Sequence, residues 1–405
     1  MSQTKIDEWK EVELWRLLTE KGYIRWPFWS ALKRWEMKDN WIPVYEQQNA
    51  IYNHRNFRYF IDQEKYNTLK RFTVQENDMV ISCSWTLGRV TKIKKNDPIW
   101  IISQALLILR PDTGIVEPQY LKYFLSSKRW FNSMVSRSSW SVQVNLAKRP
   151  VIESIPFLLP PLPEQKNITS VLSSFDDKIE LLREQNETLE KIAQTLFKEW
   201  FGKYSVDRPD ELPEGWRVWE LSELINHIKK SLMPATWEMY SHYSIPWFDN
   251  WMTPSQDNWE DILSSKYEVQ ANSFLVSKLN PWTPRVWTVL DPMDNGVCSW
   301  EFQVMKPKET NFFSYAYSIL NSNTYTRSMW MSAHWTSSSH QRIKPSDILD
   351  YEIIIPDEDK LTDYNNIILP MINKMDSNRS DIVQLSKTRD ALLPKLMSGK
   401  VRVRF

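Results

Sequence analysis

Apolar residues recur between positions 168 and 196 at steps that alternate between four and three residues. This spacing keeps one stripe of a helix apolar over four heptads and is typical of a coiled-coil seam. Because a proline-rich run at 160–163 closes the preceding segment, we predict a long helix within residues 161–204. The predicted seam consists of Ile168, Leu172, Phe175, Ile179, Leu182, Asn186 and Leu189, and it continues through Ala193 and Leu196.

A second stripe with similar spacing follows 196 residues later and predicts a second long helix within residues 358–405. Two matched helices in one chain are expected to pack antiparallel, with Asn186 and Asn378 as polar seam positions that fix the register. The alternative is an ordinary amphipathic helix lying on a globular core. The second seam consists of Ile368, Met371, Met375, Asn378, Ile382 and Leu385, flanked by Tyr364, Arg389 and Leu392.

Short runs rich in β-branched residues and bounded by turn residues precede each helix. We predict strands over residues 78–83 and 99–109, echoed by strands over residues 272–278 and 297–305. Residues 120–127 (YLKYFLSS) are expected to form a short helix. The segment before each long helix is therefore expected to be a mixed α/β domain.

The chain also repeats itself. Trp9-Lys10 matches Trp216-Arg217, and the blocks 103–111 and 152–160 match 299–307 and 348–356 at a common offset of 196 residues. We therefore predict an α+β fold with pseudo-two-fold symmetry, in which a long antiparallel coiled-coil helix pair separates two repeated α/β domains. The expected boundaries are 1–160 and 205–357 for the domains, and 161–204 and 358–405 for the helices.

The composition is unusual, with 22 Trp and only 7 Gly in 405 residues. Trp follows Asp-Asn three times, at Trp41, Trp251 and Trp259, whereas Gly follows it once, at Gly296. Asn-Gly favours tight turns because Gly accepts a positive φ angle without steric cost, and Asn-Trp offers no such advantage. The chain therefore resembles an ordinary protein in which most Gly positions are written as Trp.

Some bacterial lineages read the codon UGA as Gly and others read it as Trp, so our hypothesis is translation with the wrong code. A left-handed backbone costs an ordinary residue roughly 1–2 kcal/mol. Several such sites would consume much of the net stability of a domain, which is about 5–15 kcal/mol. We expect the doubtful Trp residues at turns, at strand ends and on the surface. The alternative is a genuinely Trp-rich protein.

Charge and cysteine content narrow the function classes. Residues 1–160 carry 24 Lys and Arg against 16 Asp and Glu, whereas residues 205–356 carry 12 against 19. Only the first segment has the basic balance of a polyanion binder. Cys83 and Cys298 form neither a disulfide framework nor a metal motif. Since the N-terminus shows no signal peptide and no apolar run reaches membrane length, we expect a cytoplasmic protein without membrane contact.

Several motifs identify a family resemblance. The stretches LPPLPEQKNI (159–168) and KIELLREQNETLEKIAQTLFKEWF (178–201) resemble the central region of type I restriction–modification specificity subunits. CSWTLGRV (83–90), SIPWFDNWMTPS (244–255) and HQRIKPSDILDYEI (340–353) resemble parts of their target-recognition domains. Where this family usually has Gly, the chain has Trp26, Trp29, Trp35, Trp41, Trp85, Trp140, Trp251, Trp300 and Trp335. Trp9, Trp200, Trp216 and Trp287 match places where the resemblance implies a true Trp.

The resemblance implies a DNA-recognition subunit without catalysis of its own. Each domain would read one half of a bipartite double-stranded target. The helix pair would dock two methylation subunits and, in the larger complex, a restriction subunit. The subunit itself would hold no cofactor; S-adenosylmethionine, and ATP with Mg for restriction, would belong to the other subunits. A helix of about 36 residues spans about 54 Å, so the pair could act as a ruler for the spacer between half-sites about one to two DNA turns apart.

No catalytic or metal-binding motif supports an enzyme with a fused nuclease or methyltransferase. Asn280-Pro281-Trp282-Thr283 lacks the second Pro of an amino-methyltransferase motif, and the five His residues show no paired spacing. A Trp-rich carbohydrate- or surface-binding protein is the alternative from another class. This alternative requires that UGG codons encode the Trp residues and that the protein is secreted.

Contacts to bases favour Arg, Lys, Asn, Gln, Ser and Thr, and contacts to phosphates favour Lys and Arg. Two polar stretches at corresponding places in the repeat, each following a doubtful Trp, are candidate DNA contacts, together with a basic cluster in the first domain. The alternative is solvated loops without a ligand. The candidates are His54, Arg55 and Arg58; Arg137, Ser138, Gln143 and Asn145; and Ser337, Ser338, His340, Gln341, Arg342 and Lys344.

Overall fold

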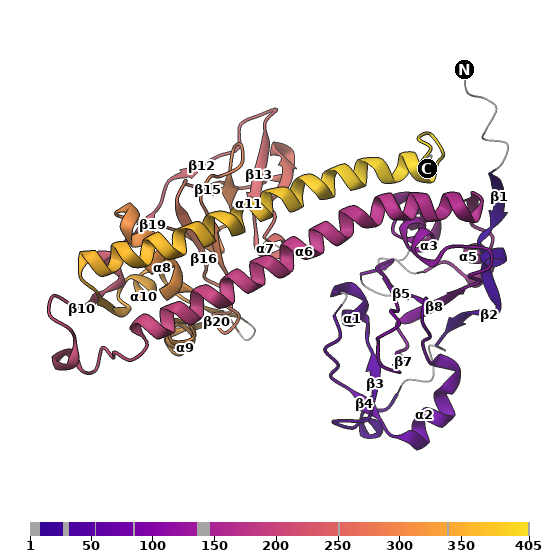
Figure 1. The fold of residues 1–405 in the computed structure, drawn as a ribbon, viewed down its shortest axis with the longest axis horizontal. Helices are drawn as coiled ribbons and strands as arrows, with labels where there is room; N and C mark the ends of the chain where they lie inside the picture. Colours follow the sequence, from indigo (N-terminus) through magenta and orange to yellow (C-terminus); the bar gives the residue numbers. More distant parts are fainter. Residues whose placement is uncertain are drawn as a thin grey trace. The chain divides into compact units, whose positions relative to one another are not determined.

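The computed structural model describes residues 9–26, 32–52, 54–83, 86–135, 146–249, 252–337 and 340–403. The chain folds as two compact units. Unit 1 comprises Met1–Asp176 with Lys387–Phe405, and unit 2 comprises Asp177–Ser386. Both units draw on the two long helices, α6 (Leu162–Phe201) and α11 (Glu358–Met397), which Figure 1 shows in magenta and yellow.

Unit 1 is built around an antiparallel four-stranded sheet of order β2-β8-β5-β6. Alternate residues of β8 face opposite sides: Leu107 and Leu109 join the core shared with α6, whereas Leu106 and Ile108 join a separate core. Both faces are covered, which explains the continuous apolar run in this strand. The bounds are β2 (Leu18–Arg25), β8 (Leu106–Pro111), β5 (Met79–Ser82) and β6 (Val90–Lys92).

Smaller elements complete unit 1. A three-stranded sheet of order β4-β3-β7 covers one core, and β1 pairs antiparallel with β9. The strands are β4 (Phe60–Ile61), β3 (Ile42–Tyr45), β7 (Ile101–Ile102), β1 (Lys10–Glu13) and β9 (Pro156–Leu159). The short helices are α1 (Gln47–Tyr52), α2 (Gln63–Leu69), α3 (Pro118–Leu125), α4 (Lys128–Met134) and α5 (Arg149–Glu153).

Unit 2 contains an antiparallel sheet of order β11-β19-β16-β17 and a five-stranded sheet of order β12-β15-β18-β13-β14. The first has β11 (Ile225–Ile228), β19 (Phe302–Pro307), β16 (Ser273–Ser277) and β17 (Val286–Val289). The second has β12 (Ser231–Leu232), β15 (Lys266–Glu268), β18 (Val297–Cys298), β13 (Met239–Tyr243) and β14 (Ser255–Asn258).

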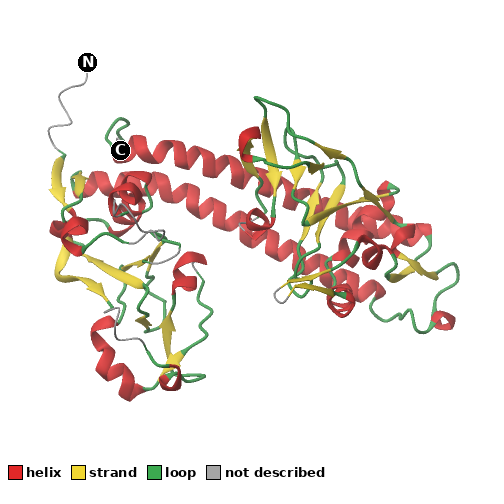
Figure 2. Cartoon of the chain, turned by 180° about the vertical axis from the view of Figure 1, so that it is seen from behind, coloured by secondary structure: helices red, strands yellow, loops and turns green. Residues whose placement is uncertain are grey.

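Further strand pairs and short helices complete unit 2; Figure 2 colours strands yellow and helices red. β10 pairs antiparallel with β22, and β20 forms a hairpin with β21. These strands are β10 (Arg217–Glu220), β22 (Glu352–Ile355), β20 (His334–Ser337) and β21 (His340–Arg342). The short helices are α7 (Ile245–Asp249), α8 (Phe313–Leu320), α9 (Asn323–Ser332) and α10 (Pro345–Leu349).

The two long helices pack on each other within each unit. In unit 1, Leu172 of α6 shares a core with Leu396 of α11. In unit 2, Ile179 and Leu182 form a cluster with Ile382. The fold is therefore α+β with long helices, as the apolar spacing predicts. The division into four domains stays a prediction.

Two predicted strands are wrong as single strands. Residues 99–109 form β7 and β8, which belong to different sheets, because the chain turns where Leu106 donates its backbone N–H to the Ser103 carbonyl. Residues 297–305 likewise divide into β18 and β19 at a turn in which Phe302 donates to Ser299. A continuous apolar run does not reveal where a buried chain changes sheet.

The Trp positions divide into two classes. Trp41 is 68% exposed with a φ angle of 108°, and Trp237 is 87% exposed with a φ angle of 72°; both conformations favour Gly. Trp35 and Trp300 are also exposed, and Trp259 is half-buried at the start of a short 3₁₀ helix. Trp29, Trp85, Trp140 and Trp251 lie outside the described residues, as does the side chain of Trp335.

Trp26 corrects the expectation that doubtful Trp residues avoid cores. It is buried directly after β2 and stacks on Phe72, with ring centroids 4.3 Å apart. The positions expected to carry true Trp pack well: Trp287 is buried, while Trp9 and Trp216 donate indole N–H groups to Glu164 at 2.9 Å and Asp357 at 2.8 Å. Trp200 lies half-buried under the Lys360 ammonium.

Candidate nucleic-acid interface

The three basic candidates of unit 1 have partners within that unit. Arg55 forms two hydrogen bonds of 2.9 Å with Asp97 and lies over the Trp100 ring. This bidentate pair rigidifies the loop that follows α1. The partners of the other two candidates are Glu46 for Arg58, at 2.9 and 3.0 Å, and Asn49 for the ring of His54, at 3.1 Å.

The exposed fractions of the two Arg side chains differ, which bears on whether each could reach DNA. Arg58 is 59% exposed and its surface pair with Glu46 is weak, so a phosphate could replace the carboxylate. Arg55 is only 25% exposed, and its transfer to a phosphate would leave the buried Asp97 carboxylate unpaired. Arg58 is therefore the better placed of the two, while the role of all three in DNA binding stays a prediction.

The polar stretch of unit 2 forms the hairpin β20–β21 and the turn into α10. Gln341 is buried, Arg342 pairs with Glu301 at 2.7 Å, and Lys344 is exposed at the start of α10. Ser338 lies outside the described residues, as do the side chains of Ser337 and His340. The matching stretch of unit 1, with Arg137, Ser138, Gln143 and Asn145, also lies outside them.

The hairpin lies against the end of β16, a neighbour that sequence reasoning missed. Asn280 donates its backbone N–H to the Gln341 carbonyl at 3.0 Å, and Ile343 donates to the Lys278 carbonyl at 3.0 Å. Lys278 therefore stands beside the predicted polar stretch. Its sequence signal was weak, because a single Lys after a strand is common on any protein surface.

Neither thiol has the character of a nucleophile. Cys83 and Cys298 are both buried, and burial raises the pKa of each thiol to about 12. Each is therefore protonated at neutral pH and unreactive. Within the described ranges, no group of His, Cys, Asp and Glu side chains could hold a metal ion.

The seam positions of the helices are mostly buried. Ile168, Leu172, Ile179, Leu182, Ile368, Met375, Asn378 and Ile382 are buried, while Phe175, Asn186, Leu189, Met371 and Leu385 are half-buried. Ile372, which lies outside the predicted seam, is fully buried and packs with Ile368 in the core of unit 2. This second stripe turns α11 toward the β-sheet core as well as toward α6.

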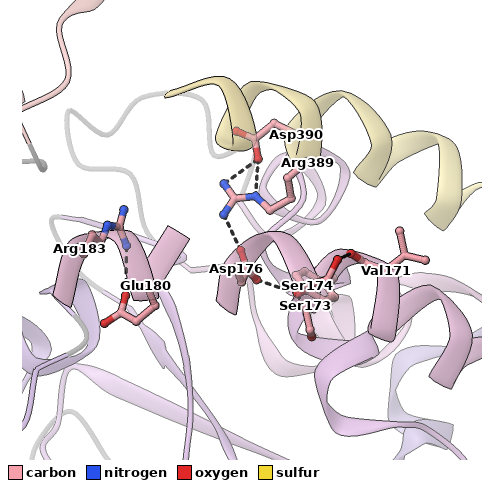
Figure 3. Close-up of polar contacts among 9 residues, drawn as sticks. Val171, Ser173, Ser174, Asp176, Glu180, Arg183, Arg389 and Asp390 are labelled. Carbon is pink, nitrogen blue, oxygen red and sulfur yellow. Dashed lines mark hydrogen bonds and ion pairs between the residues drawn. The ribbon is translucent and has the colours of Figure 1, made fainter. Parts of the chain in front are cut away.

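Polar contacts join the helices beside the apolar seam. In unit 2, Asn378 donates to Asn186 at 2.7 Å and to Gln185 at 2.9 Å, while Asn186 donates to the Met375 carbonyl at 3.1 Å. In unit 1, Arg389 bridges Asp176 and Asp390 at 2.7 and 2.8 Å (Figure 3). Because these groups pair only in one alignment, they favour a single register of the two helices.

Comparison with known proteins finds one family to which this chain is similar. Residues 8–191 match the model of the type I restriction modification DNA specificity domain. The MjaIX specificity subunit of a type I restriction enzyme from Methanocaldococcus jannaschii is 27% identical over 324 residues, covering 74% of this chain and 73% of that protein. The chain is thus similar to the specificity subunits of type I restriction–modification systems.

The similarity to specificity subunits extends beyond residues 8–191 of this chain. The HindI specificity subunit of Haemophilus influenzae is 22% identical and covers 78% of this chain and 84% of its own length. The crystal structure of the S subunit of the type I system from M. genitalium shares the fold, with a TM-score of 0.55 over 98% of both chains at 13% identity. In the described part of this chain, no helix is both long and apolar enough to cross a membrane.

Proposed function

We propose that this chain is the non-catalytic subunit that selects the DNA target of a type I restriction–modification complex, with each unit reading one half of a bipartite sequence. The observation that carries this proposal is the shared strand order of the two units. The order β2-β8-β5-β6 in unit 1 corresponds element by element to β11-β19-β16-β17 in unit 2.

Smaller features support an internal repeat. β1 pairs with β9 as β10 pairs with β22, and the strands of both pairs run antiparallel. The residue before each first strand is a Trp whose indole N–H reaches a carboxylate beside the start of a long helix, Glu164 or Asp357. Two copies of one reading unit are what a bipartite DNA site requires.

The proposed partners follow from this role. DNA and the methylation subunit, in two copies, would bind this chain, and a restriction subunit would join in the larger complex. S-adenosylmethionine, and ATP with Mg, would be held by those other subunits. The helix pair α6–α11 would dock the methylation subunits and set the spacer between the half-sites, since each 40-residue helix has a length of about 60 Å.

A domain exchange tests the proposal. Residues 205–357 are replaced by the corresponding segment of a specificity subunit with another target, and the complex with its methylation subunit is expressed in a methylation-free host. Sequencing of modified bases should show one half-site changed and the other retained. Loss of both half-sites, or methylation without sequence preference in the unchanged complex, would count against the proposal. Binding of an oligosaccharide by the chain, with no methylation, would favour the Trp-rich surface binder instead.

A further inference from the structure

Several cationic side chains of unit 2 gather at one corner. Residues 205–356 carry 19 acidic against 12 basic residues, which is unfavourable for approach to DNA. At the Lys278 corner, however, several basic residues of different strands and loops meet. We define the Lys278 corner as Lys229, Lys230, Lys278 and Arg342, with His227 and the aromatic ring of Tyr267.

Contacts within unit 2 establish this grouping. The Lys278 ammonium lies 5.7 Å from the centre of the Tyr267 ring, which makes a T-shaped contact with Trp300 at 4.2 Å. The ring of His227 lies 6.5 Å from that of Tyr267. The backbone of Lys278 donates to Glu301, whose carboxylate pairs with Arg342. Charges that are far apart in the sequence therefore meet beside the ends of β11, β16 and β21.

The corner has fewer anionic than cationic groups in the described structure. Glu268 pairs with Lys230 at 2.8 Å and Glu301 pairs with Arg342 at 2.7 Å. Lys278 is half-buried, and burial is the main cause that lowers its pKa, with Arg342 adding to the effect. Burial is the main cause that lowers the pKa of His227, and the positive charges of Lys229 and Lys278 add to the effect. Cations held together in this way are stabilised by an external anion.

Unit 1 carries basic residues at the corresponding place. In β2, Ile24 pairs with Ile108, and in β11, Ile228 pairs with Val304, so Arg25 and Lys229 follow at equivalent positions. Arg149 lies 4.8 Å from the ring centre of Tyr23, the counterpart of His227. The same edge of the sheet is thus basic and aromatic in both units, although the residue types differ.

We propose that the Lys278 corner is the surface through which the acidic second unit contacts the phosphate backbone of duplex DNA. The inference rests on the proposed function, because it assumes that unit 2 approaches DNA, and it adds the surface that does so. The predicted polar hairpin adjoins this corner through Lys278 and Arg342. The corner would therefore position the hairpin against the DNA, while contacts to bases select the DNA sequence that is recognised.

The test uses the complete chain assembled with its methylation subunit and a random-sequence duplex of 40 base pairs as the probe. The variant Lys229→Ala/Lys278→Ala removes two cations; Lys229 is exposed, so its single substitution keeps the fold intact. Loss of two phosphate contacts should reduce the slope of log affinity against log salt by about two and weaken binding roughly tenfold to a hundredfold at 0.1 M salt. Lys278→Arg should retain binding.

Lys308→Ala is the matched control, because Lys308 is an exposed Lys beyond the opposite end of β19. It should match the unchanged chain in affinity and salt slope. Lys229→Ala and the double variant could also show the affinity and salt slope of the unchanged chain. If the unchanged complex still methylates its specific site, that result overturns the inference and leaves the proposed function standing. If the variants bind DNA normally but fail to assemble with the methylation subunit, the corner docks an acidic protein surface and the inference is likewise overturned. An unchanged complex without site-specific methylation overturns both.

Discussion

At the scale of single residues, backbone conformation separates the Trp residues that composition alone groups together. Trp41 and Trp237 have positive φ angles and large exposed fractions. Their rings therefore add little packing energy to offset the strain of a left-handed backbone. Trp26 and Trp287, by contrast, are buried: Trp26 stacks on Phe72, and Trp287 makes a T-shaped contact with Tyr243. The hypothesis that UGA codons stand behind many of these residues is therefore strongest at positions 41 and 237.

We expect Trp41→Gly and Trp237→Gly each to raise the free energy of unfolding by about 1 kcal/mol. Release of left-handed strain outweighs the added entropy of the unfolded chain. Urea denaturation measures the change, and Trp35→Gly is the control because Trp35 is exposed without a positive φ angle. Equal effects of all three substitutions would refute the conformational explanation. UGG codons at positions 41 and 237 in the gene would refute the recoding hypothesis there.

At the scale of secondary-structure elements, periodic patterns were more informative than local composition. The alternation of three- and four-residue steps predicted both long helices, because a seam must recur over many turns. It missed Ile372, which faces the sheet core, since one helix can bury two stripes. It also missed Lys278, whose significance comes only from neighbours on other strands. Contacts between distant segments leave no local periodicity in the sequence.

The Asn pair between α6 and α11 should contribute to alignment more than to stability. Asn378→Ala removes the donor to Gln185 and Asn186, and we expect a loss of about 1–3 kcal/mol in the free energy of unfolding. Asn186→Leu/Asn378→Leu should restore the stability, because apolar groups replace both partners. Asn373→Ala, at an exposed position of α11, is the control for thermal denaturation. A double variant less stable than Asn378→Ala would contradict this expectation.

At the scale of the whole molecule, the two halves differ in charge although they share a strand order. The acidic balance of residues 205–356 should make DNA binding by the isolated chain weak. We expect tight, sequence-specific binding only after the methylation subunit joins. Fluorescence anisotropy at several salt concentrations, with and without that subunit, measures the difference. Tight sequence-specific binding by the isolated chain would contradict this expectation.

Deleting one heptad from each long helix tests whether their length sets the DNA spacer. Residues 177–183 and 381–387 are suitable, because the deletions include the apolar cluster made only by α6 and α11. They preserve the Asn186–Asn378 contact of unit 2 and the Asp176–Arg389 contact of unit 1. Each deletion of seven residues keeps the heptad period of the seam.

One heptad of helix spans about 10 Å, which corresponds to about three base pairs of duplex DNA at 3.4 Å each. The doubly deleted subunit should therefore methylate both original half-sites with a spacer shortened by about three base pairs, as sequencing of modified bases would show. Deletion from α6 alone is the control: it shifts one helix against the other, so methylation should be lost. Altered half-sites, or an unchanged spacer in the double deletion, would exclude helix length as the ruler and assign the spacing to the partner subunits.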